Sequence, residues 1–226
     1  MKLSRTHCIF GSLIGLMVLI KIFDLVFNPN KIFPGRIAVF PWLEILITLV
    51  LGIIGLFLYK KTRLPGFEEI RKRKAIIISI GAGLGFSILL VIIDAFARIG
   101  DISVGWPLSI IFYIWGSIST EIIFRLFAIS LIVWLFSNVI FRKKHNTQIY
   151  WIGSAILSLI VVASMVMGLM QIANLSILTL LLIGIIVIIS ELASFKLLRK
   201  YGFLSNLVFR MSFYLIWHIL WPVVFY

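Results

Sequence analysis

Long apolar stretches separated by short polar segments make up nearly the whole chain. A helix needs about 20 apolar residues to cross a hydrocarbon layer of about 30 Å, and seven stretches approach that length. We predict membrane-spanning helices at residues 8–28, 37–59, 75–97, 103–136, 149–171, 176–196 and 205–225. The pattern therefore predicts an all-α membrane protein, a bundle of about seven transmembrane helices that forms one domain over residues 1–226.

The composition excludes a soluble globular protein. Hydrophobic residues make up 62% of the chain and charged residues 13%, and the mean hydropathy is +1.17. That leaves too little polar surface to cover a soluble globule of this length. The first apolar stretch follows a basic start but lacks a small-x-small cleavage site, so we expect it to be a retained helix and not a cleaved signal peptide.

The positive charges predict an orientation in the cell membrane. The net charge is +13, but the cations lie between apolar stretches and not on one soluble face, so we expect no nucleic-acid partner. With seven helices, the basic clusters at residues 2–5, 60–74, 142–144 and 196–200 all fall on one side, which leaves Lys31, Arg36 and Arg98 on the other. The positive-inside rule then predicts a cytoplasmic amino terminus and an outside carboxyl terminus.

The same rule decides how to interpret the long fourth stretch. Cutting residues 103–136 into two helices would reverse every later loop and place the basic residues 142–144 outside. We therefore predict one long helix, tilted or kinked near residues 116–120.

Charged residues within the predicted helices are the candidates for function, because each is costly in a bilayer unless it is paired or hydrated. Lys21 can pair with Asp24, and Asp94 with Arg98, each on one helix face. These two pairs have a structural explanation. Glu44 has no evident partner in the sequence and stays unassigned.

Positions along the helices suggest further contacts. At about 1.5 Å per residue, Glu191 and Arg210 lie at a similar depth on consecutive antiparallel helices and could pair. Glu121 and His218 share a deeper level, with Gln171 within a turn or two of it. Arg125 lies one turn from Glu121 on the same face, where neutralising Glu121 is one of its two plausible roles.

Three segments resemble the signatures of a known family. The string "TEIIFR", residues 120–125, resembles the E-E-x-x-x-R motif of the CAAX prenyl protease and bacteriocin-processing (CPBP) family of intramembrane proteases, and "LFAISLIVWLF" continues the likeness. The string "MGLMQ", residues 167–171, resembles the F-x-x-x-H motif, and the chain after "KYG" resembles the segment that carries H-x-x-x-N or H-x-x-x-D. The likeness covers about residues 104–226.

The chain departs from these signatures at several positions. Thr120 replaces the first glutamate, and Gln171 replaces the histidine of the second motif. For the third motif the usual spacing selects Arg210 and Tyr214, whereas a register two turns later selects His218 and Pro222. The motif spacing thus favours Arg210 beside Glu121, and the depth estimate favours His218. We follow the depth estimate for proximity and the motif spacing for the alignment, so we expect a polar centre of Glu121, Arg125 and His218.

The resemblance implies an intramembrane endopeptidase in which a glutamate activates water. The candidate catalytic residues are then Glu121 as base, His218 as acid or base and Arg125 as a charge stabiliser. Gln171, Arg210 and Tyr214 would line the site. Because each general acid or base contributes roughly 10²–10⁴-fold, the substitutions predict weak or absent proteolysis if the family mechanism applies.

Partners and alternative functions follow from the same residues. We expect membrane lipid as the surroundings and a membrane-embedded or lipidated peptide as substrate. No metal or cofactor is predicted, because the three histidines, His7, His145 and His218, form no H-E-x-x-H motif and Cys8 is the only cysteine. One alternative is a catalytically silent scaffold or a partner of the bacteriocin-immunity type. A second is a transporter or channel.

Overall fold

The structure is a computed structural model, and it describes residues 5–27, 41–62, 64, 73–97, 99, 105–142, 145–172 and 175–225. Within these ranges the regular structure is helical throughout, without strands. The elements in chain order are α1 (Arg5–Phe27), α2 (Pro41–Thr62), α3 (Arg73–Ala97), α4 (Leu108–Thr120), η2 (Glu121–Ala128), α5 (Ile129–Ile132), η3 (Val133–Ile140), α6 (Asn146–Ile172), α7 (Ile177–Tyr201), α8 (Phe203–Tyr214), η4 (Leu215–Leu220) and α9 (Trp221–Phe225). The η elements are π-helical.

The predicted all-α bundle of seven spanning helices is confirmed. Seven helical stretches of the described chain are long and apolar enough to cross a membrane, and each overlaps one predicted span. Several of them extend beyond the predicted limits, as at Arg5, Arg73 and Tyr201. These helices can continue past the hydrocarbon layer because their ends carry basic residues. The long cationic side chains reach the polar region there.

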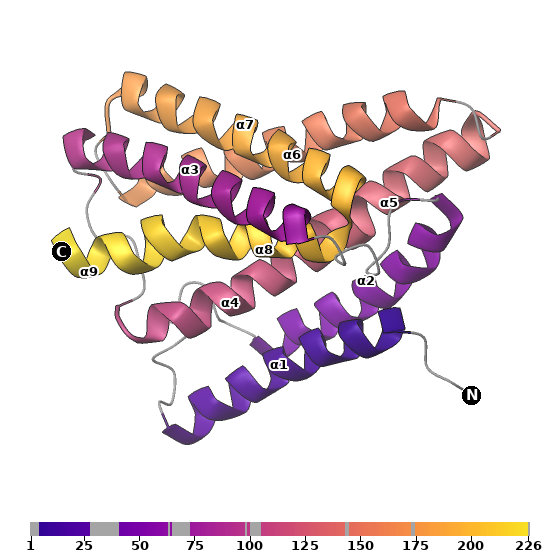
Figure 1. The fold of residues 1–226 in the computed structure, drawn as a ribbon, viewed down its shortest axis with the longest axis horizontal. Coiled ribbons are helices and arrows are strands. Elements are labelled where there is room, and N and C mark those ends of the chain that lie inside the picture. Colours follow the sequence, from indigo (N-terminus) through magenta and orange to yellow (C-terminus); the bar gives the residue numbers. More distant parts are fainter. Residues whose placement is uncertain are drawn as a thin grey trace.

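The fourth span is one continuous helical stretch, Leu108–Ile140, as predicted. It runs obliquely across the bundle from α4 through α5 (Figure 1). Its hydrogen-bonding pattern changes from α to π directly after residues 116–120, at Glu121. A π turn accommodates one more residue than an α turn, and such turns are frequent at functional sites.

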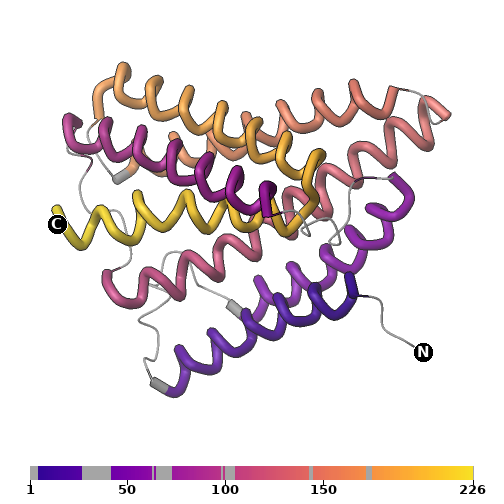
Figure 2. Tube along the Cα trace, in the orientation of Figure 1, coloured from indigo at the N-terminus to yellow at the C-terminus, as the bar shows by residue number. Residues whose placement is uncertain are grey.

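The last span, α8 to α9, lies at the centre of the bundle. Figures 1 and 2 show it between α3 and α4, and α8 also packs against α7 and η2. The buried apolar residues form two clusters, one around α1, α2 and η2 and another around η4 and the facing parts of α3, α6 and α7. The neighbours of Glu191 along α7 belong to different clusters, Phe195 to the first and Val187 to the second. A polar layer thus lies between two apolar regions.

Small residues allow α3 to approach α8 closely. A Cβ atom on Gly83 would lie 2.5 Å from the backbone oxygen of Phe209, so this position admits no side chain without a shift. One turn earlier, the hydroxyls of Ser79 and Ser205 lie 2.6 Å apart. Close approach through small residues and interhelical hydrogen bonds is the usual way in which helices associate in lipid.

One side chain of α3 connects directly to the backbone of the last span where α8 changes to η4. The Ser87 hydroxyl donates to the Phe213 carbonyl oxygen at 2.6 Å and accepts from the Trp217 backbone N–H at 2.8 Å. These two backbone groups are four residues apart and would bond to each other in an α-helix. The serine hydroxyl inserted between them explains why the helix adopts π geometry here.

Two ion pairs were predicted on single helix faces, Lys21 with Asp24 and Asp94 with Arg98. Lys21 Nζ lies 2.7 Å from Asp24 Oδ2, so this pair on α1 is confirmed. Arg98, the predicted partner of Asp94, lies outside the described residues. Asp94 accepts hydrogen bonds from Ile99 N and Trp221 Nε1. Glu44 lies in the first turn of α2, where a carboxylate interacts favourably with the helix dipole.

Candidate functional site

Four charged side chains meet in the polar layer between the two apolar clusters. Glu121 and Arg125 come from η2, Glu191 from α7 and Arg210 from α8, and their side chains are between 0% and 5% exposed. Arg210 donates from Nε to Glu121 Oε1 at 2.9 Å and from Nη1 to Glu191 Oε1 at 2.7 Å. Arg125 donates from Nη2 to Glu191 Oε2, and its Nε lies 3.8 Å from Glu121 Oε2. The formal charges of the four residues sum to zero.

Two neutral side chains close these contacts into a ring. Asn206 Nδ2 donates to Glu121 Oε2, and Asn206 Oδ1 accepts from the Ser194 hydroxyl at 2.6 Å. Ser194 in turn accepts from Arg125 Nη2 at 3.3 Å. We call the six residues the ionic ring: Glu121, Arg125, Glu191, Ser194, Asn206 and Arg210. Every carboxylate oxygen in the ring therefore has a donor.

Donors exceed acceptors in the ionic ring. Arg125 Nη1 and Arg210 Nη2 are buried and have no acceptor among the described residues. The guanidinium of Arg125 also stacks on Phe195, with Cζ 4.5 Å from the ring centroid, which favours the cation electrostatically. An additional hydrogen-bond acceptor could therefore be bound at the ring, but an additional donor would find its carboxylates already engaged.

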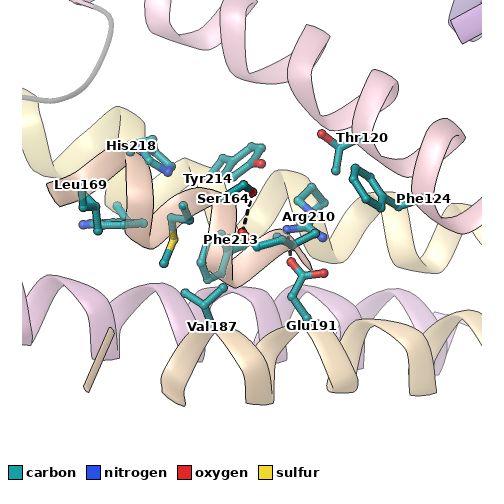
Figure 3. A pocket seen from close by; sticks show the side chains of 14 residues that line it. Thr120, Phe124, Ser164, Leu169, Val187, Glu191, Arg210, Phe213, Tyr214 and His218 are labelled. Atoms are coloured by element: carbon teal, nitrogen blue, oxygen red, sulfur yellow. Dashed lines mark hydrogen bonds and ion pairs between the residues drawn. The ribbon is translucent and has the colours of Figure 1, made fainter. Parts of the chain in front are cut away.

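A cavity of about 430 Å³ lies beside the ionic ring. We call it the pocket; the side chains that line it come from α4, η2, α6, α7, α8 and η4, and they are Thr120, Phe124, Val161, Ser164, Met165, Gly168, Leu169, Val187, Glu191, Arg210, Phe213, Tyr214, Trp217 and His218. Figure 3 shows Glu191 and Arg210 joined at its floor, with Thr120 and Phe124 to one side. The pocket is thus mainly apolar with a few polar groups, the usual character of a ligand site.

Two adjacent residues of the fourth span point in different directions. Thr120, the last residue of α4, lines the pocket (Figure 3), whereas Glu121, which follows it, is fully buried in the ionic ring and is not one of the described residues that line the pocket. Successive residues of a helix point about 100° apart, which accounts for the difference. The carboxylate of this segment therefore faces the ring, and the neutral side chain of Thr120 lines the pocket.

His218 lies in the pocket among aromatic rings. Its ring stacks on Tyr113 with centroids 4.5 Å apart, and Tyr214 and Trp217 contact it at 5.2 and 4.5 Å. Its Nδ1 atom has no hydrogen-bond partner among the described residues. His218 thus forms an aromatic wall of the pocket that Glu191 also lines, and it is held there by ring contacts.

The structure decides between the two predicted partners of Glu121. Glu121 contacts Arg210, as the motif spacing indicated, and the expectation from depth that it faces His218 is corrected. The depth estimate treated the fourth span as perpendicular to the membrane, but this span is 33 residues long and oblique, so its residues lie less deep than their number suggests (Figure 1). The predicted contact between Glu191 and Arg210 is confirmed.

The remaining candidate residues divide between ring and pocket. Arg125 belongs to the ionic ring, where its closest carboxylate is Glu191 and not Glu121. Tyr214 lines the pocket. Gln171 is corrected: its side chain is exposed near the end of α6, and it is not among the described lining residues, because Gly168 and Leu169 occupy the pocket-facing positions of that helix.

Sequence reasoning missed three residues of the site. Arg210, Tyr214 and His218 follow each other at i,i+4 spacing, and extending this stripe one turn back would have found Asn206. Ser194 lies three residues after Glu191 and could have been found in the same way. The stacking of Tyr113 on His218 depends on how α4 crosses the last span, and no sequence signal marks it.

Within the described chain, no three His, Cys, Asp or Glu side chains gather as a metal-ligand group. Comparison of the sequence and the structure with protein-family models, curated proteins and solved structures finds no match.

Proposed function

We propose that this multi-pass membrane protein is a catalytically silent relative of the CPBP family, which binds a membrane-embedded or lipidated peptide in the pocket without cleaving it. The observation that supports the proposal best is the direction of two adjacent side chains. Thr120 lines the pocket, and Glu121 is held in the ionic ring.

Glutamate-dependent hydrolysis needs a carboxylate that can accept a proton from water near the scissile bond. Both oxygens of Glu121 already accept hydrogen bonds from Arg210 and Asn206. Glu191 does reach the pocket, but both its oxygens accept from guanidinium groups. Because all four carboxylate oxygens already accept hydrogen bonds, neither glutamate has an oxygen free to take a proton from water.

Binding, by contrast, needs only features that the pocket has. Its volume of about 430 Å³ lies within the usual range for small-ligand sites, roughly 300–1,000 Å³. Met165 provides apolar surface that can adapt to a ligand, Trp217 adds aromatic surface, and Arg210 adds an unused donor. A site with this lining favours an apolar ligand that carries a hydrogen-bond acceptor.

The test is to follow binding and cleavage together. The purified protein in detergent micelles is incubated with a panel of membrane and CAAX-type peptides, and mass spectrometry records both the peptide that co-purifies and any product. We expect intact peptide with the wild type and with Thr120→Gln, which adds a side chain of glutamate size without charge. Thr120→Glu adds to the pocket a carboxylate that does not belong to the ionic ring, so any product should form with this variant.

Cleavage by the wild type that disappears in His218→Ala would contradict the proposal, since it would show that the pocket already has a working active site. His218 contacts the ionic ring through no described hydrogen bond, so this variant tests the pocket without breaking the buried charges. Thermal unfolding of each variant shows whether its fold is retained.

For the orientation in the membrane, we propose that the end of the bundle with Lys60, Lys61, Arg142 and Arg199 is cytoplasmic. These four residues lie at or near the ends of α2, η3 and α7, and the end of α9 lies on the opposite side of the bundle (Figure 1). The positive-inside rule assigns such an end to the cytoplasm.

A further inference from the structure

We propose that the pocket recognises a fatty-acyl carbonyl, as an ester or amide, through Arg210. The inference rests on the proposed binding function of the pocket and adds the chemical group that the pocket selects. The observation behind it is a donor without an acceptor. Arg210 is 95% buried, since its side chain is 5% exposed, and it lines the pocket while its Nη2 has no acceptor among the described residues.

The charge of the ionic ring favours a neutral acceptor. Arg210 already contacts two carboxylates, Glu121 and Glu191, and the four charges of the ring sum to zero. A ligand carboxylate would place a net negative charge in this buried site. An ester or amide carbonyl accepts the hydrogen bond without adding a charge. The free donor is therefore suited to a carbonyl oxygen and not to an anion.

The rest of the lining suits a hydrocarbon chain. Apolar side chains, among them Val161, Met165, Leu169 and Val187, come from α6 and α7, while Arg210 and Tyr214 lie together on α8. A chain that extends along α6 with its carbonyl at Arg210 would satisfy both parts of the surface (Figure 3). An unsatisfied buried donor also makes this position selective, because a ligand without an acceptor leaves it unpaired.

The experiment uses brominated acyl probes, which quench nearby tryptophan fluorescence. Trp217 lines the pocket, so a probe bound there should quench its fluorescence. The quenching that disappears in Trp217→Phe is therefore the part that reports binding in the pocket. Four probes share one dibrominated chain: a methyl ester, a methyl amide, the free acid at neutral pH and the hydrocarbon without a carbonyl. The ester and amide arms distinguish a glycerolipid type of ligand from an acylated-peptide type.

A matched pair of variants tests the place of binding. Gly168 lines the pocket and a Cβ there meets no atom within 4 Å, so Gly168→Leu fills the cavity without a backbone clash. Gly85 is exposed on α3, and a Cβ there also meets nothing within 4 Å. Gly85→Leu is therefore the control that makes the same substitution in another spanning helix, away from the pocket.

We expect the ester or the amide to bind at least about 10-fold more tightly than the hydrocarbon, as one hydrogen bond to a charged donor implies. Binding should be lost in Gly168→Leu and kept in Gly85→Leu. In Arg210→Lys, provided that it unfolds at a temperature near that of the wild type, the preference for the carbonyl should shrink.

Each result that differs from these expectations would overturn a specific part of the inference. Equal binding of hydrocarbon and carbonyl probes would overturn the recognition by Arg210 and leave the binding pocket in place. Tighter binding of the free acid than of the ester and amide would overturn the preference for a neutral group. Quenching that Gly168→Leu does not change would overturn the inference together with the proposed binding function.

Discussion

Removing one charge from the ionic ring should destabilise the protein strongly. Glu191 accepts from both guanidinium groups of the ring and is 1% exposed. In Glu191→Gln the two arginines share a single carboxylate, which leaves one uncompensated positive charge in a buried site. Breaking a buried ion pair from one side costs about 3–5 kcal/mol, which corresponds to a factor of roughly 10²–10⁴ in the unfolding equilibrium.

A second substitution should recover part of this loss. The double variant Arg125→Gln/Glu191→Gln restores a net charge of zero, because one pair of opposite charges is removed together. We expect the double variant to lose less stability than the two single variants lose in total. The difference should be up to about 3 kcal/mol, the upper range for residues in direct contact. Glu121 lies 3.8 Å from Arg125 Nε, so the pair Glu121–Arg125 should couple more weakly.

The assay is unfolding in mixed micelles with increasing dodecyl sulfate, followed by tryptophan fluorescence and helical circular dichroism. Ser190→Ala is the control, because Ser190 precedes Glu191, is buried and donates to the Val187 carbonyl of its own helix. A Glu191→Gln variant as stable as Ser190→Ala, or purely additive single effects, would refute the view that the ring is a mutually stabilised unit.

The other predictions concern packing and orientation. Ser87→Ala should destabilise the protein by about 1–3 kcal/mol, because it leaves two buried backbone groups of the last span without their shared partner; the same unfolding assay measures this. Gly83→Ala should cost about 1–3 kcal/mol through overpacking against α8, while Gly85→Ala at an open position should be neutral or stabilising. In a cysteine-free background, Lys60→Cys should be protected from a membrane-impermeant thiol reagent in intact cells and Phe225→Cys should react, and the reverse pattern would contradict a cytoplasmic basic end.

The sequence was sufficient to predict the fold class because the apolar stretches have the length that a bilayer requires. The long fourth span was also predictable, since the charge of the loop after it decides against cutting the stretch in two. Neither argument depends on how the helices pack against each other. That is why the helix number was right while the neighbours of individual side chains were only partly right.

The site was predictable where two residues lie near the same end of consecutive helices, as for Glu191 and Arg210. It was not predictable where helix tilt matters. The spacing of the motif resemblance did indicate the contact of Glu121 with Arg210, but the depth estimate did not, because the fourth span runs obliquely across the bundle. The change to π geometry at Leu215 likewise depends on a tertiary contact, the inserted Ser87 hydroxyl.

The chemical fate of a bound ligand tests the account most directly. The wild-type protein is loaded with an acyl-amide probe or a co-purifying peptide, held for several hours and analysed by mass spectrometry, with Gly168→Leu as the variant whose pocket is filled. The account predicts that the ligand bound by the wild type stays intact and that Gly168→Leu binds none. Hydrolysis of the ligand by the wild type that Gly168→Leu abolishes would contradict it, because the pocket would then be an active site.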